Sequence, residues 1–590
     1  MNWKLSALVS AIWTCALAQN PPTMYPPVRG TFGLIGAANN FEVEAGWRVL
    51  SNGGNAVDAG VAAVLAASVT EMSRFGLGGE MPLLVKMAGK QPVAISGVGV
   101  APRLATIDYF QHRQPEPWED REHMPPIPAE GIRASITPGV FDGLILALDK
   151  FGTKSFAVVA APAIEYATNG FPLPEEFAKF LRGYQPIMAT WPDSFRFFYP
   201  NGTPTSRGEL FREPLLATTL RELVAAEKKA RGGRSKKLAA VRDLFYKGNI
   251  ARRIARFEEA NGGLIRYDDL AHFHAETDTP RTGTYRGYEI HKPGFWTQGP
   301  VMIEALNILE GFDLKAMGHN SALYLHTVVE AVKLAFADRD RYYGDPKFSQ
   351  IPEDVLLSKN YAAARRKLID AEHASLESRP GDLAAPVIMP SAPPAPTTVN
   401  DTTCVNVVDR NGNAFSATPS GAWLPSVIAG DTGIPMNTRL QSFVFTLGHP
   451  NLLQPGKRPR VTLSPTLVTK DGQLALVMST PGGDNQDQAM LQVLLNMLDF
   501  GMNPQEAVEA PRFQSEQFYS SFGNHEFTRG RLSVEGRVPR AVTDRLSALG
   551  HTVTVAGDWS NSSAPTVIWV QGGVLHGGAD IRRARFVFGR

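Results

Sequence analysis

The chain has 590 residues, of which 43% are hydrophobic and 20% charged, and its formal net charge is +2. This is the composition of an ordinary globular protein with a large core. So small a net charge gives no long-range attraction to nucleic acid or to anionic lipid. We therefore expect neither kind of partner, and no pattern in the sequence predicts a metal site or a cofactor.

The first eighteen residues have the pattern of a secretory signal peptide. Lys4 precedes an apolar run, residues 5–18, that ends in small residues. The run is too short to span a bilayer, and no later stretch is long and apolar enough to do so. We therefore predict a secreted protein without a membrane anchor, from which residues 1–18 are removed. Cys404 is then the only cysteine, so no intramolecular disulfide can form.

Three Asn-X-Ser/Thr sequons are candidate glycosylation sites, at Asn201, Asn400 and Asn561. They predict a glycoprotein if the host is eukaryotic. Sequons also arise by chance, so an unmodified asparagine is the alternative at each position.

The first part of the mature chain alternates helices with glycine turns. Val43 to Leu50 predicts a helix that ends at the glycine-rich stretch 51–55. Residues 56–68 are small and apolar, which favours a helix buried on most sides. A glycine loop, 76–79, then precedes a strand at 82–86. Its spacing matches neither the dinucleotide-binding nor the P-loop pattern, so we do not expect nucleotide binding.

The middle of the chain is mainly helical. We predict helices at 141–151, 155–168 and within 209–275, a strand at 281–292 and a helix at 302–314.

A further helix is predicted from His326 to Arg339. His326 and Glu330 lie one turn apart on it, but no second histidine completes a His-Glu-X-X-His zinc motif. We therefore interpret them as a structural pair.

The stretch around Thr402 has the strongest functional pattern. A strand at 405–409 turns at Asn411-Gly412 and returns through 414–420. The preceding arm, 386–398, is too rich in proline to form a helix or a central strand. Such an arm would expose a bond before Thr402 to self-cleavage, giving a threonine whose hydroxyl and amine serve as nucleophile and base. The alternative is a proline-rich linker followed by an ordinary hairpin.

A second candidate site lies further along the chain. A buried strand, 473–479, leads through Gly482-Gly483 into a helix at 488–500. A strand, a Gly-Gly turn and a helix start can direct backbone N–H groups into one space, as an oxyanion hole requires. Residues 566–577 predict a final hairpin.

Taken together, these segments resemble the γ-glutamyltransferase (glutathione hydrolase) family of N-terminal-nucleophile hydrolases over nearly the whole mature chain. The matching segments are 53–59, 76–79, 137–139, 245–248, 261–265, 330–339, 401–403, 409–414, 464–466, 481–483 and 510–513.

The resemblance implies an α+β fold, a four-layer αββα sandwich made as one proenzyme. Cleavage between Asp401 and Thr402 would give a large subunit, 19–401, and a small subunit, 402–590, which together form one domain and an internal heterodimer. It also implies that Thr402 is the nucleophile and that Ser420, where the family usually has threonine, supplies the supporting hydroxyl. The oxyanion glycines would be Gly482 and Gly483.

The sequence departs from the family where the γ-glutamyl group would bind. Val98 stands in place of the arginine that holds the substrate α-carboxylate, and Ser442 in place of the aspartate that holds the α-amine. Ala422-Trp423 replaces an asparagine, Val461-Thr462 replaces a Ser-Ser pair, and the loop 447–455 is short.

Arg439 stands where the family has glutamine, and it changes the charge of the site. Arg439 could hold a substrate carboxylate or another anion on the side where the family binds an amine. The alternative is that it turns to solvent or pairs with an acid such as Asp431. Trp423, Ser442 and Asp484 are further candidates for substrate binding.

These observations predict a secreted, self-cleaving threonine amidohydrolase or acylase. Its partner would be a small-molecule amide that is not a γ-glutamyl compound. One alternative is a γ-glutamyltransferase or glutathione hydrolase that binds glutamate through other residues. A second alternative is a secreted relative without catalytic activity.

Overall fold

The predicted hairpin after Thr402 lies at the centre of a sheet. Strand β10, Val405–Asp409, pairs antiparallel with β11, Ala414–Ala417, in a register that places Asn406 opposite Ser416. The turn needs a positive φ, and Gly412 supplies it at 79°. Asp409 fixes both ends of the turn, because its carboxylate accepts hydrogen bonds from the N–H groups of Asn411 (2.9 Å) and Asn413 (3.1 Å).

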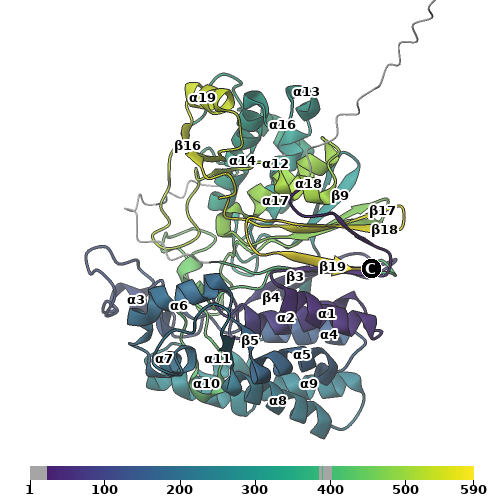
Figure 1. Cartoon of the computed structure of the whole chain (residues 1–590). Helices are drawn as coiled ribbons and strands as arrows, with labels where there is room; N and C mark the ends of the chain where they lie inside the picture. The colour runs from purple at the N-terminus through teal and green to yellow at the C-terminus, as the bar shows by residue number, and fades with distance from the viewer. Residues whose placement is uncertain (1–22, 384–388, 390–400) are drawn as a thin grey trace, which may run out of the picture.

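The computed structural model describes residues 23–383, 389 and 401–590 (Figure 1). Within these residues the hairpin belongs to a seven-stranded antiparallel sheet in the order β19-β2-β10-β11-β3-β4-β7. The other strands are β2 Gly33–Ala37, β3 Met81–Lys86, β4 Val93–Gly97, β7 Glu276–Asp278 and β19 Phe586–Gly589.

A second antiparallel sheet of the described residues faces the first, with seven strands in the order β1-β18-β17-β13-β12-β9-β8. Its strands are β1 Val28–Gly30, β8 Arg281–Tyr285, β9 Tyr288–Lys292, β12 Thr466–Lys470, β13 Gln473–Ser479, β17 Thr566–Gln571 and β18 Val574–Ala579. The single strand predicted at 281–292 is wrong. Arg286 and Gly287 both have positive φ, 49° and 82°, and they turn the chain between β8 and β9.

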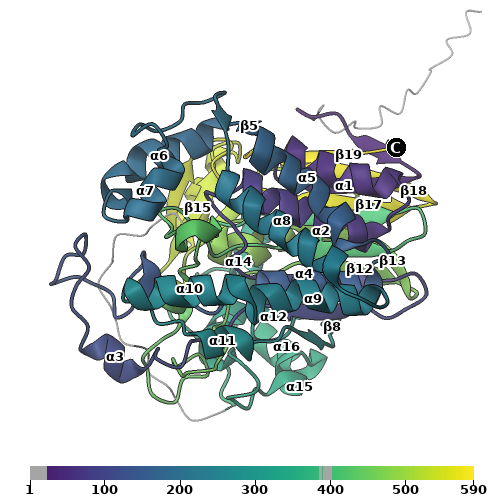
Figure 2. The same ribbon diagram turned by 90° about the horizontal axis from the view of Figure 1, so that it is seen from below.

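Helices cover the outer face of the sheet that contains β10, and Figure 2 shows them from outside. They are α1 Asn40–Ser51, α2 Ala56–Thr70, α4 Val140–Phe151, α5 Phe156–Asn169, α6 Glu175–Met188, α7 Pro192–Phe198, α8 Pro214–Lys229, α9 Arg234–Tyr246, α10 Asn249–Ala260 and α11 Tyr267–Ala271. Helix α2 begins at Asn55, whose side chain caps the N–H groups of Val57 and Asp58. It lies very close to the sheet, because a Cβ on Gly60 would be 2.4 Å from the Phe415 ring.

A second set of helices covers the other sheet. They are α12 Pro300–Leu309, α13 Leu314–Met317, α14 Ala322–Tyr342, α15 Glu353–Leu356, α16 Lys359–Arg366, α17 Gln486–Leu498, α18 Pro504–Glu509 and α19 Arg540–Ala548. The helix predicted at 302–314 ends earlier, at Leu309, and a new one starts at Leu314. Outside the layers lie α3 Ile107–Gln111, β5 Phe171–Pro172, β6 Leu210–Phe211, β14 Phe513–Ser515, β15 Arg531–Glu535 and β16 Thr552–Ala556.

The two sheets pack through an apolar interior. Leu34, Leu84 and Val408 of one sheet and Leu467 and Val477 of the other form one buried cluster. Each set of helices forms its own cluster with the sheet that it covers. The result is helix, sheet, sheet, helix, as Figure 1 shows, so the expected αββα sandwich is confirmed.

Three sequence predictions fall outside the described residues: the signal peptide 1–18, the sequon at Asn400 and nearly all of the proline-rich arm 386–398. Of the helices that are described, none combines the length and apolar character needed to cross a membrane.

Candidate active site

Thr402 lies directly before β10, deep in the molecule. A β-bridge joins it to Ser420, which follows β11, and this brings Thr402 Oγ to 3.1 Å from Ser420 Oγ. Thr402 is 2% exposed and Ser420 is fully buried. The hairpin therefore places the predicted nucleophile and its supporting hydroxyl within hydrogen-bonding distance of each other.

The carboxylate of Asp401 is held by two arginines. Arg74 Nε lies 2.5 Å from Asp401 Oδ2, and Arg583 binds the same oxygen. The other oxygen accepts the N–H of Thr402 at 2.8 Å. Burial alone would raise the pKa of Asp401, but Arg583 and Arg74 outweigh burial and lower it to about 2. The residue before Thr402 is thus ionised and anchored.

The carbonyl oxygen of Asp401 also has two donors. Ser420 Oγ donates to it at 2.9 Å, and the indole Nε1 of Trp423 donates to it as well. Trp423 Nε1 lies 3.2 Å from Ser420 Oγ, so both donors converge on one side of the Asp401–Thr402 peptide.

Arg439 is fully buried behind these donors and pairs with Glu80, Nε to Oε1 at 2.6 Å. Its guanidinium lies over the Trp423 ring, 4.4 Å from the centroid, and Nη2 donates to Ser420 Oγ at 3.3 Å. Burial lowers the pKa of Arg439, and the charge of Glu80 opposes that shift. The alternative partner Asp431 is wrong, because Asp431 pairs on the surface with Arg253.

The glycine loop 76–79 allows this close packing. The backbones of Glu80 and Ser420 exchange two hydrogen bonds, 3.0 and 2.9 Å. A Cβ on Gly79 would lie 2.2 Å from the Ser420 carbonyl oxygen, and one on Gly78 would lie 2.1 Å from that of Pro435. The glycines therefore bring backbone against backbone beside Thr402, which is a packing role.

Gly482 and Gly483 form the turn between β13 and α17, and their φ angles are 120° and 55°. Within the described part of the chain, neither N–H donates to a protein acceptor. Gln486, the first residue of α17, reaches Thr402 Oγ with Nε2 at 3.5 Å. The turn and Thr402 therefore lie in one candidate site, in which two backbone N–H groups are unpaired among the described residues.

Asp484 belongs to a different buried network. Its carboxylate pairs with Arg339 and accepts the N–H of Ser521 at 3.0 Å. Burial would raise the pKa of Asp484, but Arg339 and then Arg460 lower it overall. These partners orient Asp484 toward α14 and away from the role of a free substrate-binding group.

Position 98, where the family pattern has the arginine that holds a substrate carboxylate, is apolar in this chain. Val98 is fully buried in a hydrophobic cluster with Leu440 and Val461. Ser442 is also buried, and its hydroxyl lies 3.5 Å from Arg439 Nη1. No cation occupies position 98, and the hydroxyl at 442 carries no charge.

Comparison with known proteins agrees with this geometry. The family model described as gamma-glutamyltranspeptidase matches residues 43–589. The chain belongs to the γ-glutamyltranspeptidase family.

Relatives of this family include both hydrolases and acylases. The glutathione hydrolase proenzyme of Escherichia coli (strain K12) is 33% identical over 575 residues, covering 95% of this chain and 92% of that protein. The acylase ACY 1 proenzyme of Pseudomonas sp. (strain SE83) is 32% identical over 532 residues, covering 89% and 88%. The crystal structure of cephalosporin acylase from Bacillus halodurans superposes with a TM-score of 0.83 at 29% identity, covering 97% and 98%.

Four charged residues of this γ-glutamyltranspeptidase-family site were not predicted as site residues from the sequence: Arg74, Glu80, Arg339 and Arg583. Arg339 lies in one of the family segments, but only the fold shows that it binds Asp484. For Arg74, Glu80 and Arg583 no local pattern signals the role, because their partners are far away in the sequence.

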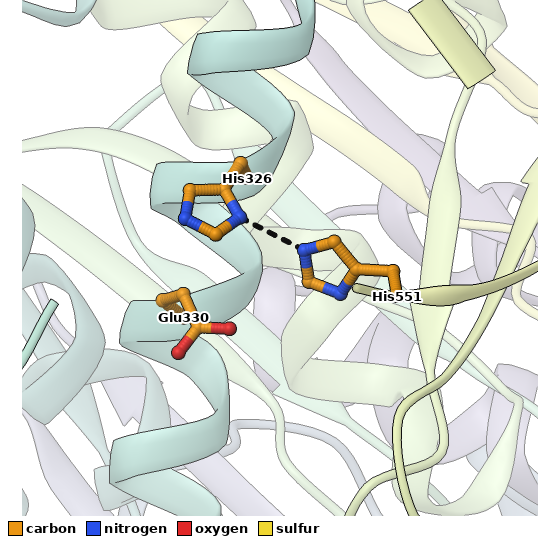
Figure 3. A group of neighbouring side chains, drawn as sticks. All are labelled: His326, Glu330 and His551. Atoms are coloured by element: carbon orange, nitrogen blue, oxygen red, sulfur yellow. Dashed lines mark hydrogen bonds between the residues drawn. The ribbon is translucent and has the colours of Figure 1, made fainter. Parts of the chain in front are cut away.

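A buried group outside the site has the residue types of a metal site. His551 joins His326 and Glu330, and their ligand atoms all lie within 4.8 Å of one another (Figure 3). His326 binds the Asp370 carbonyl at 2.7 Å and His551 at 2.9 Å, so its two nitrogens are both engaged.

The third member of this group is engaged as well. Glu330 pairs with Lys333 and with Arg379, the latter at 3.0 Å. These bonds use the atoms that would hold a metal ion, and two cations adjoin them. We interpret the group as a hydrogen-bonded link between α14 and the segment after α19.

Two sequons are described by the structure. Asn201 is exposed in the loop after α7. Asn561 is half-buried, and its Nδ2, the atom to which a glycan would be attached, donates to the Phe513 carbonyl at 3.3 Å. Asn201 is therefore the better candidate.

Proposed function

We propose that the chain is the proenzyme of a threonine amide hydrolase that cleaves its own Asp401–Thr402 bond. The observation that carries the proposal is Thr402 Oγ, 3.1 Å from Ser420 Oγ and next to a buried peptide whose carbonyl is already hydrogen-bonded. The word proenzyme in the names of both relatives supports cleavage.

The mature enzyme would act through an acyl-enzyme. Cleavage frees the amine of Thr402, which takes the proton from its own hydroxyl as Thr402 Oγ attacks a substrate amide carbonyl. The N–H groups of Gly482 and Gly483 would bind the developing oxyanion, because they are unpaired among the described residues and lie beside Gln486, which reaches the nucleophile. The amine product leaves, and water then releases the acid.

The substrate of this enzyme would be an amide with an uncharged acyl group. A γ-glutamyl head needs partners for its carboxylate and its amine, and Val98 and Ser442 offer neither charge. Each lost charged hydrogen bond is worth roughly 1.5–3 kcal/mol, so loss of both would weaken glutamate binding on the order of 10²-fold or more. Glu80 already neutralises Arg439, which removes the support for a lone substrate carboxylate there. The acylase names of two similar proteins support an amide substrate outside the γ-glutamyl class.

A γ-glutamyl hydrolase or transferase is the second candidate, favoured by the Escherichia coli relative. A panel of p-nitroanilides separates the two, with γ-glutamyl, oxamyl, uncharged aliphatic and mono-carboxylate acyl groups. We expect turnover of uncharged acyl groups at least 10²-fold above that of the γ-glutamyl compound. Efficient glutathione hydrolysis by the processed wild type would overturn the substrate proposal.

Self-cleavage is tested on denaturing gels. Wild type should give two chains, the smaller one beginning at Thr402 on N-terminal sequencing, and Thr402→Ala should stay uncut. Maturation of Thr402→Ala to the same two chains would overturn the assignment of the nucleophile. Secretion is also a proposal, and a mature N-terminus directly after residue 18 in exported protein would support it.

A further inference from the structure

We propose that the indole N–H of Trp423 is a catalytic donor in the self-cleavage step, and that with Ser420 it forms an oxyanion hole separate from the Gly482-Gly483 turn. The inference rests on the proposed self-cleavage. It concerns which groups stabilise the intermediate formed at the chain's own Asp401 carbonyl.

The geometry puts both donors on the reacting oxygen. Ser420 Oγ lies 2.9 Å from the Asp401 carbonyl oxygen, and Trp423 Nε1 donates to the same atom. Attack by Thr402 Oγ turns that oxygen into an oxyanion, so these hydrogen bonds strengthen as the reaction proceeds. Trp423 is 3% exposed, and a buried donor acts on the developing charge with little screening by water.

Ser420 also connects the nucleophile to the same oxygen. Its hydroxyl donates to the Asp401 carbonyl, and one of its lone pairs can accept from Thr402 Oγ at 3.1 Å while the other accepts from Arg439 Nη2. Arg439 Nη2, at 3.3 Å, adds a positive charge beside Ser420 Oγ. The proton of Thr402 Oγ can therefore pass to Ser420 as the proton of Ser420 moves to the oxyanion.

The remaining steps balance without any group beyond water. The Thr402 Oγ–carbon bond forms and, as the tetrahedral intermediate collapses, the carbon–nitrogen bond breaks. The nitrogen keeps its hydrogen and takes up the proton that Ser420 had passed to the carbonyl oxygen, so it becomes the amine of Thr402. The Asp401 carbonyl re-forms as an ester on Thr402 Oγ. One water molecule hydrolyses the ester, giving the Asp401 carboxylate and a free hydroxyl on Thr402.

The surroundings of Trp423 fix the direction of its N–H. The Arg439 guanidinium lies over one part of the indole, 4.4 Å from the centroid, and the Phe522 ring meets it edge-on at 5.7 Å. Arg439 is itself fixed by Glu80, whose backbone pairs with Ser420. Arg439 and Glu80 thus act as positioning residues for both donors.

The Gly482-Gly483 turn does not share this task. No bond joins either glycine N–H to the Asp401 carbonyl in the described structure, whereas Ser420 and Trp423 both bond to it. We infer that the turn serves substrates after cleavage and that Trp423 serves the cleavage itself.

Pulse-labelled synthesis of the full chain, followed on denaturing gels, measures the cleavage rate. Trp423→Phe keeps a ring under Arg439 but lacks the N–H, and loss of one oxyanion donor typically slows a reaction about 10²–10³-fold. We expect that loss in cleavage rate. The matched control is Trp569→Phe in β17, a strand of the sheet that does not contain β10, and it should cleave at the wild-type rate.

A second pair of variants separates chemistry from folding. Thermal unfolding of Trp423→Phe in the uncut Thr402→Ala background should lie within a few degrees of Thr402→Ala alone. If it does not, β-(3-benzothienyl)alanine at position 423 keeps the shape of the indole and replaces the N–H by sulfur, and it should show the same slow cleavage.

The outcomes distinguish this inference from the proposed function. If a folded chain without the indole N–H at position 423 is cleaved within threefold of the wild-type rate, and Thr402→Ala stays uncut, the role of Trp423 is overturned. The proposal that Thr402 cleaves the chain is then unaffected. An uncut wild type, or a cut Thr402→Ala, overturns self-cleavage by Thr402 and the inference with it.

Discussion

Replacement of Gly482 by alanine should disable the substrate oxyanion hole. A Cβ at this position would lie 2.2 Å from Ser563 Oγ and 3.1 Å from Ser563 Cα, and the φ of 120° is one that side-chain-bearing residues rarely adopt. The Ser563 backbone cannot move away freely, because Arg512 and Asn561 both bond to it. Ser563 Oγ can rotate away, but the contact with Ser563 Cα and the strained φ remain, so the Gly482 turn must shift by a few tenths of an ångström and change its backbone angles.

Changed backbone angles in the turn point its N–H groups in another direction. Loss of one oxyanion donor costs about 10²–10³-fold in kcat. We expect Gly482→Ala to lose kcat in this range. Gly501→Ala is the matched control, because Gly501 also has a positive φ, 72°, but no atom lies within 4 Å of its added Cβ. It should lose only about 1–2 kcal/mol of stability and keep its kcat.

The assay is release of p-nitroaniline by processed enzyme under saturating substrate, with thermal unfolding as a check on folding. Self-cleavage of Gly482→Ala should continue, because Ser420 and Trp423 are the donors to the Asp401 carbonyl. If the folded, processed Gly482→Ala enzyme keeps kcat within threefold of wild type, the reasoning about the turn is refuted.

Three further predictions concern buried ionisable groups. Arg439→Met leaves the Glu80 carboxylate buried without its cation, so the free energy of unfolding should fall by about 3–5 kcal/mol. Adding Glu80→Gln should restore much of the lost Tm, and an unchanged Tm for the single variant would contradict the prediction. Burial would raise the pKa of Asp401, but Arg583 and Arg74 lower it from 3.8 to about 2, so the ionised carboxylate contributes about 2 kcal/mol of stability above pH 4 that is lost between pH 4 and 2. In the uncut Thr402→Ala background, Asp401→Asn should therefore lower stability at pH 6 but much less at pH 2. Equal losses at the two pH values would argue against this role of Asp401. Burial, with Lys333 and His326, lowers the pKa of His551 from 6.5 to about 3. Below pH 6.5 the unfolded chain therefore binds a proton at His551 that the folded chain does not bind, and stability falls as the pH drops. His551→Gln should make the fall in Tm between pH 7 and 4.5 less steep, and a profile identical to that of wild type would contradict the lowered pKa of His551.

Much of the fold follows from local patterns in the sequence. The Asn411-Gly412 turn and the valines of β10 predict a hairpin, and the small apolar residues of α2 predict a helix buried on most sides. These signals depend on neighbours within a few residues, so they can be read without the fold. The turn within residues 281–292 was not predicted, because Arg286-Gly287 lacks the asparagine or aspartate that usually precedes glycine in a hairpin turn.

The candidate catalytic residues also follow from the sequence, because the nucleophile, the supporting hydroxyl and the glycine turn lie in short segments of the family pattern. Thr402 and Ser420 are joined by one hairpin, so the register of that hairpin alone brings their hydroxyls together. Gly482 and Gly483 are recognisable because a turn with positive φ requires glycine.

Only the tertiary structure decides what the charged side chains do. Arg439 could have bound a substrate carboxylate, but its partner is Glu80, 359 positions away, and Arg74 reaches Asp401 across 327. A buried charge must find an opposite charge or a hydrogen-bond partner, yet its own segment does not say which one. That choice depends on which distant backbones the layers bring together, and here the layers neutralise Arg439 before any substrate arrives.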